Sequence, residues 1–455
     1  MATAAAQGKY KQSEDRLISA SRIIPRPEHN ISRADISDYA LKVLYRLQNA
    51  GYQAYLVGGG VRDLLLGREP KDFDVATDAR PEEVRALFRN CRLIGRRFRL
   101  AHVHFGREII EVATFRGPAT EEGEGALQDD SGMIVRDNVY GTLEEDAWRR
   151  DFTVNALYYN IADFSVVDYT GGLDDLHAGE LRFIGDPWQR CREDPVRMLR
   201  AARFAAKLGF RLHAETAEAV RALSPLLAQV PPARLFEEVL KLFLSGHAVA
   251  AYDQLRQFHL FDHLFSQTEA SVSVQAEGVP LTFVLRALGN TDARLAEGKP
   301  VTPAFLFAAL LWEPLQLHAR RYEADGVPKA EAVQLAADEV IAGQVARVAI
   351  PRRFTQPMRE IWALQERLTR RAGRRAAQLI EQPRFRAGYD FLLLRAEAGE
   401  DVAELAQWWT DFQEADGTTK EALVRAPAAT GEGEPERKRR RRRRRRRTAQ
   451  PTPDA

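Results

Sequence analysis

The pattern of apolar positions changes along the 455 residues, and its first part alternates short apolar runs with stretches of helical periodicity. Residues 36–50 predict a helix closed by Gly51, and residues 61–67 and 81–90 predict two shorter helices. Apolar and β-branched runs predict strands over residues 54–59, 71–77, 92–105 and 107–115, the last two as antiparallel neighbours. This order of elements predicts an α/β opening.

Helical periodicity begins near residue 138 and continues to about residue 425, with no repeat of fixed length. The segment at residues 118–133, "PATEEGEGALQDDSGM", is acidic and contains glycine, which predicts a loop. Residues 1–35 are expected to form a weakly ordered, flexible arm. The chain is therefore expected to be an α+β protein of more than one domain, in which a helical array follows a mixed one.

Composition narrows the class of protein and its compartment. An apolar content of 45% is enough to bury a large core. No uncharged apolar stretch is long enough to cross a bilayer, and the N-terminal residues lack a run of signal-peptide length, so no membrane association is expected. Cys91 and Cys191 are too few for a disulfide framework or a thiolate zinc site, which favours a cytoplasmic protein.

The net charge of +2 hides an uneven distribution. Residues 437–447, "RKRRRRRRRRR", contain 11 of the 66 Lys and Arg residues, which leaves 55 basic against 64 acidic residues elsewhere. Such a run repels itself and is expected to be disordered, and arginine forks suit phosphate oxygens, so we expect a polyanion partner. A solubilising or nuclear-address tail is the alternative.

Two carboxylates, Asp72 and Asp74, stand one residue apart in "DFD". On a strand they project from the same face, where like charges repel unless cations lie between them. Carboxylates suit Mg²⁺, with Mn²⁺ as an alternative, and two such ions promote in-line displacement at phosphorus. Glu111 and Asp151 are both candidates for a third carboxylate, and spacing does not choose between them. The alternative is an ordinary acidic pair at a strand end.

A glycine run, "VGGGVRD", precedes the acidic pair at a predicted strand-to-helix junction. Gly59 and Gly60 would let backbone N–H groups approach a phosphate chain, and Arg62 would reach its charge. The alternative is a tight turn with positive φ at both glycines and Arg62 paired with a surface carboxylate. A phosphate cradle so close to a metal pair favours a nucleoside triphosphate site.

The segment "REDPVRMLRAARFAAKLGF", residues 192–210, predicts a helix with Asp194 at its N-cap and Pro195 in the first position. Arg197, Arg200 and Arg203 recur every three residues and share one broad face of that helix. Asp194 accepts and Arg197 donates hydrogen bonds, which matches the pairing edges of adenine and cytosine. A solvated arginine face is the alternative.

Four segments, in this order and spacing, resemble the class II branch of the nucleotidyltransferase superfamily, which comprises tRNA CCA-adding enzymes and bacterial poly(A) polymerases. They are "LVGGGVRDLLLG…DFDVAT", "EIIEVATFRG", "RRDFTVNALYY" and "EDPVRMLRAARFAAKLGF", within roughly residues 40–250. The resemblance implies a polymerase β-like head with a mixed or antiparallel sheet, then a helical neck, body and tail. The expected boundaries are 36–180 for the catalytic head, 181–245 for the base-recognising neck, 246–425 for the RNA-binding body and 426–455 for the disordered basic tail.

The resemblance also implies residue roles. Asp72 and Asp74 would carry the metals, and Asp151 would be the further catalytic carboxylate. The expected nucleotide-binding residues are Gly59, Gly60, Arg62, Arg150, Asp194, Arg197, Arg200 and Arg203.

Within this branch, "RLIGRRFRLAHVHF" departs from the short "GT" element usual in the tRNA enzymes, and with the arginine tail this favours poly(A) polymerases. We therefore expect template-independent transfer of AMP from ATP to RNA 3′ ends, release of pyrophosphate, a role in RNA decay, and RNA-decay proteins as partners of the tail. A tRNA CCA-adding enzyme using CTP and ATP is the first alternative, and a non-catalytic RNA-binding protein is the second.

Residues 350–391 concentrate arginines around four aromatic side chains, Phe354, Trp362, Phe385 and Tyr389. We expect these aromatics in the core rather than in an RNA groove, and some of the arginines in contact with RNA.

Overall fold

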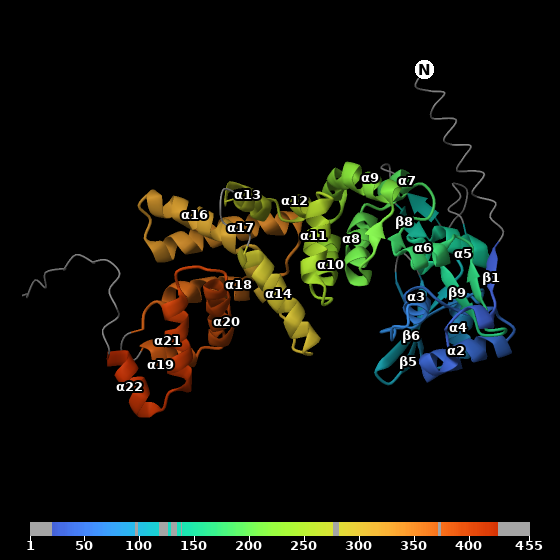
Figure 1. The fold of residues 1–455 in the computed structure, drawn as a ribbon, viewed down its shortest axis with the longest axis horizontal. Helices are drawn as coiled ribbons and strands as arrows, with labels where there is room; N and C mark the ends of the chain where they lie inside the picture. Colours follow the sequence, from blue (N-terminus) through green and yellow to red (C-terminus); the bar gives the residue numbers. More distant parts are fainter. Residues whose placement is uncertain are drawn as a thin grey trace, which may run out of the picture.

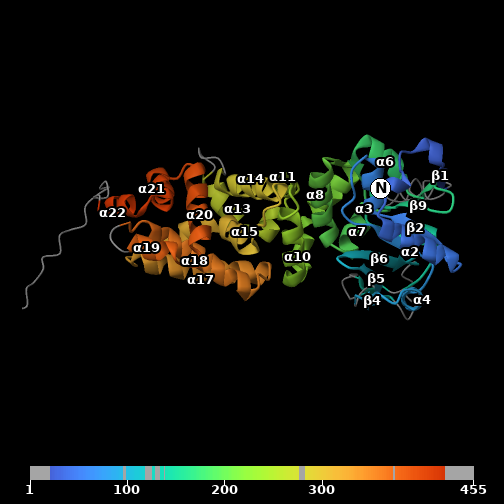
Figure 2. The same cartoon turned by 90° about the horizontal axis from the view of Figure 1, so that it is seen from below.

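The computed structural model describes residues 21–95, 99–117, 126–128, 134–137, 139–275, 282–371 and 375–425. The molecule is elongated, with a head of mixed α/β structure at one end and helices along the rest of its length (Figures 1 and 2). This arrangement confirms the predicted α+β class, with a mixed sheet in the head followed by a helical array.

The head is built on an eight-stranded sheet in the order β1-β10-β9-β2-β3-β6-β5-β4. Its strands are β1 (Arg22–Ile24), β2 (Ala54–Val57), β3 (Asp74–Thr77), β4 (Cys91–Ile94), β5 (Leu100–Phe105), β6 (Glu108–Thr114), β9 (Leu157–Asn160) and β10 (Val166–Asp168). Neighbouring strands are antiparallel except β3 and β6, which run parallel. The expected antiparallel pairing of the strands from residues 92–105 and 107–115 is confirmed, although the first of these is split into β4 and β5.

Helices of the head cover this sheet. They are α2 (Asp38–Asn49), α3 (Gly59–Leu65), α4 (Pro81–Leu87), α5 (Leu143–Arg149) and α6 (Gly172–Ala178), with 3₁₀ turns η1 (Arg26–Glu28), η2 (Arg33–Asp35) and η3 (Thr153–Asn155). In α2, the side chain of Ser37 accepts a hydrogen bond from the Tyr39 amide, and Ala40, Val43, Leu44 and Leu47 are buried at helical spacing. The predicted loop at residues 118–133 lies mostly outside the described residues, but Ala126–Gln128 forms β7, which pairs with β8 (Ile134–Asp137).

Two expectations about the head are wrong. Residues 22–35 are not a weakly ordered arm, because β1 pairs with β10 and Ile24 and Ile31 are buried. The helical region does not begin at residue 138, because Leu157–Asn160 forms β9 between β10 and β2. Leu157, Tyr158 and Tyr159 are all fully buried, so this central strand lacks the alternation that identifies a half-buried one.

The helical array continues from the head. Its elements are α7 (Pro187–Glu193), α8 (Val196–Leu208), α9 (Ala214–Leu223), η4 (Ser224–Gln229), α10 (Pro232–Phe243), α11 (Ala248–Gln257), α12 (Phe261–Leu264), α13 (Ser266–Gln275), α14 (Thr282–Ala296), α15 (Pro303–Leu310), α16 (Trp312–Ala324), α17 (Lys329–Arg347), α18 (Arg352–Leu368), α19 (Arg375–Ile380), α20 (Phe385–Glu397), α21 (Ala403–Glu414) and α22 (Gly417–Arg425). One cluster of buried side chains extends from the head into this array, and a smaller one lies at its far end. The domain boundaries therefore stay predictions.

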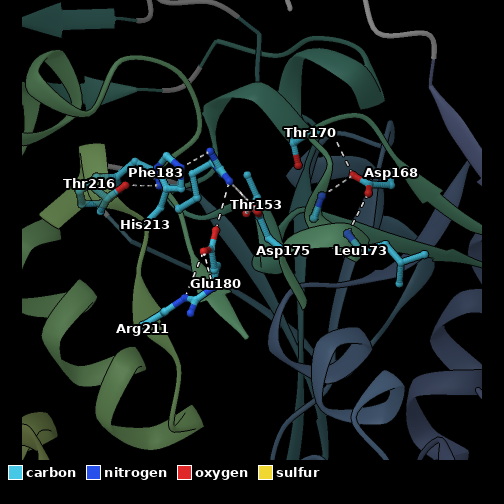
Figure 3. Close-up of polar contacts among 12 residues, drawn as sticks. Thr153, Asp168, Thr170, Leu173, Asp175, Glu180, Phe183, Arg211, His213 and Thr216 are labelled. Carbon is cyan, nitrogen blue, oxygen red and sulfur yellow. Dashed lines mark hydrogen bonds and ion pairs between the residues drawn. The ribbon is translucent and has the colours of Figure 1, made fainter. Parts of the chain in front are cut away.

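A polar junction joins the head to the first helices of the array, and Figure 3 shows its parts. The strand β11 (Glu180–Leu181) pairs in parallel with β12 (Arg211–Leu212), and Arg211 bonds Glu180 at 3.0 Å. Arg182 donates two hydrogen bonds to Asp175 at 3.0 Å, and Asp175 lies in α6 of the head. Because these bonds fix the chain on either side of α8, they hold α8 in place against the head.

The aromatic residues around the arginines of α18 are mostly in the core, as expected. Trp362 is buried in the larger cluster, and Phe354 is partly buried against that cluster. Phe385 and Tyr389 are buried in the smaller one. No helix among the described residues is long and apolar enough to cross a membrane.

Candidate active site

Asp74 is the first residue of β3 and lies near the centre of the sheet. In the parallel β3–β6 pair it is in register with Glu111, so the two carboxylates are on adjacent strands. Burial, followed by the neighbouring charges of Glu111 and Asp72, raises the pKa of Asp74 to about 6, although Arg150 and His102 lower it. Asp72 is exposed and precedes the strand. The expectation that both aspartates lie on the strand is therefore wrong for Asp72, and Asp74, the first residue of β3, is the partly buried member of the pair.

Glu111 is the third carboxylate of this group. Its side chain contacts His102 on β5: Oε2 of Glu111 lies 3.2 Å from Nε2 of His102, within hydrogen-bond distance. Asp151 instead lies beside Arg200 of α8, whose Nε and Nη2 bond its Oδ2 at 2.8 and 2.5 Å. Of the two candidates that the sequence left open, the structure brings Glu111 to Asp74.

Asp151 differs from Asp74 in that an arginine, Arg200, is bonded directly to its carboxylate. Burial would raise the pKa of Asp151, but Arg200 and the Asn155 amide outweigh burial and lower that pKa to about 2. Its Oδ1 also accepts a hydrogen bond from the Phe152 amide at 2.9 Å. With both oxygens bonded, Asp151 fixes the position of Arg200 in the described structure.

The glycine run makes the turn from β2 into α3. Positive φ occurs at Gly58 (φ 74°), whereas Gly59 and Gly60 lie in the first turn of α3. A Cβ at Gly58 would lie 3.6 Å from Nη1 of Arg150 and 3.8 Å from Oδ2 of Asp74. Gly58 therefore brings the backbone close to both the acidic group and a cation, and the sequence had indicated its two neighbours.

Arg150 has its Nη1 beside Gly58 and its other nitrogens bonded elsewhere. Its Nε and Nη2 bond Oδ2 of Asp146 at 3.1 and 2.9 Å, and Nε also bonds the Tyr158 hydroxyl at 2.8 Å. Burial lowers the pKa of Arg150, but Tyr158 and Asp146 outweigh it and keep that pKa above its usual range. Asp146 and Tyr158 were not predicted, although the spacing of Asp146 and Arg150, one helical turn, is visible in the sequence.

Arg62 is buried, with an exposure of 1%. It bonds Asp63 at 2.6 Å and the side-chain oxygen of Asn155 at 2.6 Å, and its guanidinium lies 5.5 Å from the ring centre of Phe204. In this arrangement Arg62 connects α3 to η3 and α8. A direct contact with a nucleotide stays a prediction.

The side chains of Asp194 and Arg197 are each bonded to another residue, and the Arg197 amide donates a hydrogen bond to the Asp194 carbonyl at 2.9 Å. Asp194 accepts two hydrogen bonds from Arg234 of α10, at 2.8 and 2.7 Å, and one from the Val196 amide at 3.3 Å, as expected for a helix cap. Arg197 bonds Glu193 at 2.7 Å. Arg234 was not predicted, because it lies 40 residues from Asp194 and has no local signal.

The remaining arginines of the α8 stripe gather around one aromatic ring. Arg200 and Arg203 lie 5.4 and 4.5 Å from the ring centre of Phe204. Among the residues that the structure describes, the buried Nε of Arg203 has no hydrogen-bond partner, and neither has the buried Oε2 of Glu238 on α10. Burial lowers the pKa of Arg203, and so does the neighbouring Arg200, whereas Glu238 raises it. The stripe is thus a partly buried cationic wall between the head and α10.

The acidic group fits divalent metal ions in its chemistry. Among the residues that the structure describes, no group of three or more His, Cys, Asp and Glu side chains is arranged to hold a metal ion. Magnesium sites of phosphoryl-transfer enzymes use one or two carboxylates completed by substrate phosphates and water, rather than a protein cage. The raised pKa of Asp74 shows that its negative charge is poorly compensated, which a bound cation would relieve.

Three family descriptions match the chain. Residues 54–182 match "Poly A polymerase head domain", residues 209–271 match "Probable RNA and SrmB- binding site of polymerase A", and residues 325–447 match "Polymerase A arginine-rich C-terminus". The first of these contains the acidic group, Gly58 and Arg150.

The chain is also similar to whole proteins of known name, among them poly(A) polymerases and a tRNA nucleotidyltransferase. Poly(A) polymerase I of Salmonella typhi is 54% identical over 401 residues, which cover 86% of this chain and 85% of the relative. Poly(A) polymerase I of Haemophilus influenzae is 47% identical over 425 residues, covering 92% and 94%. A CC-adding tRNA nucleotidyltransferase of Halalkalibacterium halodurans is 37% identical over 227 residues, covering 50% and 54%.

A solved structure extends the likeness to three dimensions. The Bacillus stearothermophilus CCA-adding enzyme in complex with CTP has a TM-score of 0.54 at 26% identity, covering 86% of this chain and 88% of that one. The fold and the acidic group thus define a nucleotidyltransferase with a helical array behind its catalytic head. More narrowly, the chain belongs to the bacterial poly(A) polymerase I family, and the expected branch of the superfamily is confirmed.

Proposed function

We propose that the head and the first helices of the array form the site at which AMP from ATP is added to an RNA 3′ end without a template. The RNA 3′-hydroxyl loses its proton to solvent, and its oxygen forms a bond to the α-phosphorus. The bond from that phosphorus to the bridging oxygen breaks, and pyrophosphate leaves with the electron pair. The observation that carries the proposal is geometric: Asp74 is in register with Glu111 on the adjacent strand, and Gly58 brings the backbone close to both Oδ2 of Asp74 and Nη1 of Arg150.

Divalent metal ions serve the nucleotidyltransferase superfamily, and we propose Mg²⁺ here, with Mn²⁺ as a substitute. Asp72 and Asp74 would hold the ions, with Glu111 as the third carboxylate. When bound, such ions acidify the attacking hydroxyl and neutralise charge that develops at phosphorus.

The other residues of the site would orient the nucleotide. Nη1 of Arg150, beside Gly58, is placed to neutralise phosphate oxygens, and Gly59 and Gly60 would leave room for them. Asp151 acts on the nucleotide through Arg200, which it holds in place.

Base recognition is proposed for the first helices of the array. Asp194 and Arg197 would read the adenine edge, Arg234 would hold Asp194 in position, and Arg203 would complete the cationic wall. The donor and acceptor order of Asp194 and Arg197 suits ATP and CTP alike.

For the whole protein we propose RNA 3′ ends and ATP as substrates and the cytoplasm as the compartment. The basic run at residues 437–447 would bind RNA and RNA-decay proteins, so that the added tail of A residues directs RNA to decay.

The test supplies the protein with Mg²⁺, an unstructured RNA and each nucleoside triphosphate in turn. Long products with ATP alone support poly(A) addition. CTP incorporation confined to a tRNA that lacks its 3′ end would instead support a CCA-adding enzyme, and RNA binding without extension would contradict catalysis. The Asp74→Asn variant is expected to bind RNA and add no AMP. Glu69→Gln, an exposed change in the connection that precedes β3, is the matched control.

A further inference from the structure

A cavity of about 770 Å³ lies far from the acidic group, among the last helices of the array. It is bounded by residues of α16, α17, α18, α20 and α21, and by the connection between α20 and α21. Trp312 and Trp362 contribute to its wall and are almost fully buried. We call it the body cavity.

Carboxylates outnumber basic side chains by one in the lining of the body cavity. Five acidic side chains line it, against four basic ones: Glu323, Glu366, Glu400, Asp401 and Glu404, against Arg320, Lys329, Arg371 and Arg395. Lys329 pairs with Glu366 at 3.2 Å, and Arg395 pairs with Glu400 at 2.8 Å. These two pairs cancel, which leaves three carboxylates and two arginines.

The three remaining carboxylates are available to a ligand. Glu323, Asp401 and Glu404 are exposed, and none of their side chains has a hydrogen bond or ion pair among the residues that the structure describes. Of the two remaining cations, Arg371 lies 5.8 Å from the ring centre of Trp408, and Arg320 is exposed. The open side of the body cavity therefore offers an excess of acceptors for a cation.

The wall of the cavity already binds one guanidinium group. Arg395 donates two hydrogen bonds to Oε2 of Glu400, at 2.9 and 2.8 Å, and its guanidinium lies 4.9 Å from the ring centre of Trp312. Glu400 also accepts a hydrogen bond from the Trp312 indole at 2.7 Å. Carboxylates combined with an aromatic face suit a planar guanidinium better than an ammonium group.

The chain itself supplies a strongly cationic segment within reach. Residues 437–447 carry eleven consecutive basic side chains, and eleven residues separate them from Arg425 at the end of α22. An extended connection of that length spans up to about 40 Å. Glu404 of the cavity lies in α21, and α22 packs against α21. Laid end to end, these two helices would be roughly 30 Å long, so the distance from Arg425 to the cavity is less than roughly 30 Å.

We propose that the body cavity binds arginine side chains of the chain's own basic run, residues 437–447, and that RNA competes for the same arginines. Each contact of this kind is weak in solvent, but a short connection gives an effective concentration of about 1 mM, so a few contacts are enough for partial occupancy. The basic run is then shared between the cavity and RNA, and the cavity lowers RNA affinity when RNA is scarce.

The test is a double-mutant cycle: two changes are made singly and together, and the affinity for RNA is measured for each protein. One change is the triple substitution E323Q/D401N/E404Q, and the other ends the chain at Glu436. In the full chain, at about 100 mM salt, the triple substitution is expected to tighten binding of a short unstructured RNA about three- to tenfold, because the arginines are released. In the chain ending at Glu436, the same substitution should leave RNA affinity within about twofold.

A matched control separates this effect from the general loss of negative charge. The variant E331Q/E397Q/E414Q removes three exposed carboxylates from helices that bound the cavity, but these three side chains do not line it. This variant should leave RNA affinity unchanged. Equal tightening by the control, or tightening that persists in the chain ending at Glu436, would overturn the proposal.

A direct measurement does not depend on RNA. A fluorescent peptide of the sequence of residues 437–447 should bind the chain that ends at Glu436, which retains all described residues, and the triple substitution should weaken that binding about tenfold or more. Equal affinity of the two proteins for the peptide would exclude the body cavity as its site.

Discussion

Three buried or partly buried carboxylates of the head differ in pKa because their nearest cations differ. Asp146 and Asp151 each have a directly bonded arginine, and the pKa of each is lowered to about 2 in spite of burial. Asp74 has no such bond within the described part of the chain, and burial together with Glu111 raises its pKa to about 6. The uncompensated carboxylate is therefore the one placed to bind an exogenous cation.

The first prediction concerns the effect of the negative charge of Asp74 on the free energy of unfolding. In the metal-free protein, ionised Asp74 lowers stability above pH 6, and this penalty disappears as the pH falls from about 6 toward the unfolded pKa near 4. Asp74→Asn should therefore raise the free energy of unfolding at pH 8 by roughly 1–3 kcal/mol, and have little effect at pH 4, while it abolishes AMP incorporation. Urea unfolding with a chelator, and extension assays, measure both effects. A variant that is less stable at pH 8 would contradict the interpretation.

The second prediction concerns Asp151, whose shift has the opposite sign. Its folded pKa of about 2 lies below the unfolded value, so its contribution to stability is present above about pH 4 and is lost as the pH falls toward 2. Asp151→Asn should cost about 2–3 kcal/mol at pH 7 and flatten acid unfolding between pH 4 and 2. Acid-induced unfolding followed by circular dichroism measures this. An unchanged acid profile would show that the Arg200 pair contributes little.

Helix and strand starts with local signals could be predicted, and contacts between distant elements could not. The cap at Asp194 and the helix at Pro81 follow from turn chemistry and short-range pattern, and the structure has both within a residue. The strand expected over residues 71–77 begins three residues later, at Asp74. β9 was not predicted, because a strand buried on both faces shows no alternation of apolar and polar residues. Arg200 with Asp151, and Arg234 with Asp194, depend on how α8 and α10 pack, which no spacing encodes.

The third prediction tests the contact between α8 and α10. Arg234→Met removes the two hydrogen bonds that Arg234 donates to the Asp194 carboxylate, which is 8% exposed, and should lower the free energy of unfolding by about 3 kcal/mol. If Arg234 positions Asp194 for the base, KM for ATP should rise more than kcat falls. The second change Asp194→Asn in the same chain should restore part of the stability, but not KM. Recovery of both would reduce Arg234 to a structural role.

At the scale of the whole molecule, acidic and basic charge are separated along the sequence. The eleven basic residues at 437–447 follow a remainder that has 64 acidic against 55 basic residues. RNA that approaches the array meets a surface of mixed sign, whereas the basic run offers only positive charge. Affinity for RNA and its dependence on salt should therefore depend largely on the run, and chemistry on the head.

The fourth prediction follows from this separation. Ending the chain at Glu436 should weaken RNA binding at low salt and flatten the plot of log affinity against log salt by about 0.7 for each phosphate that the run neutralises. A chain ending at Arg447 is the matched control, because residues 448–455 contain no Lys or Arg. Fluorescence anisotropy across a salt series measures the slope. Single-turnover addition of AMP at saturating RNA should be unchanged in both chains, because Asp74, Arg150 and Asp194 are retained. An unchanged slope would place the RNA contacts on the helices instead, most directly on the arginines of α18.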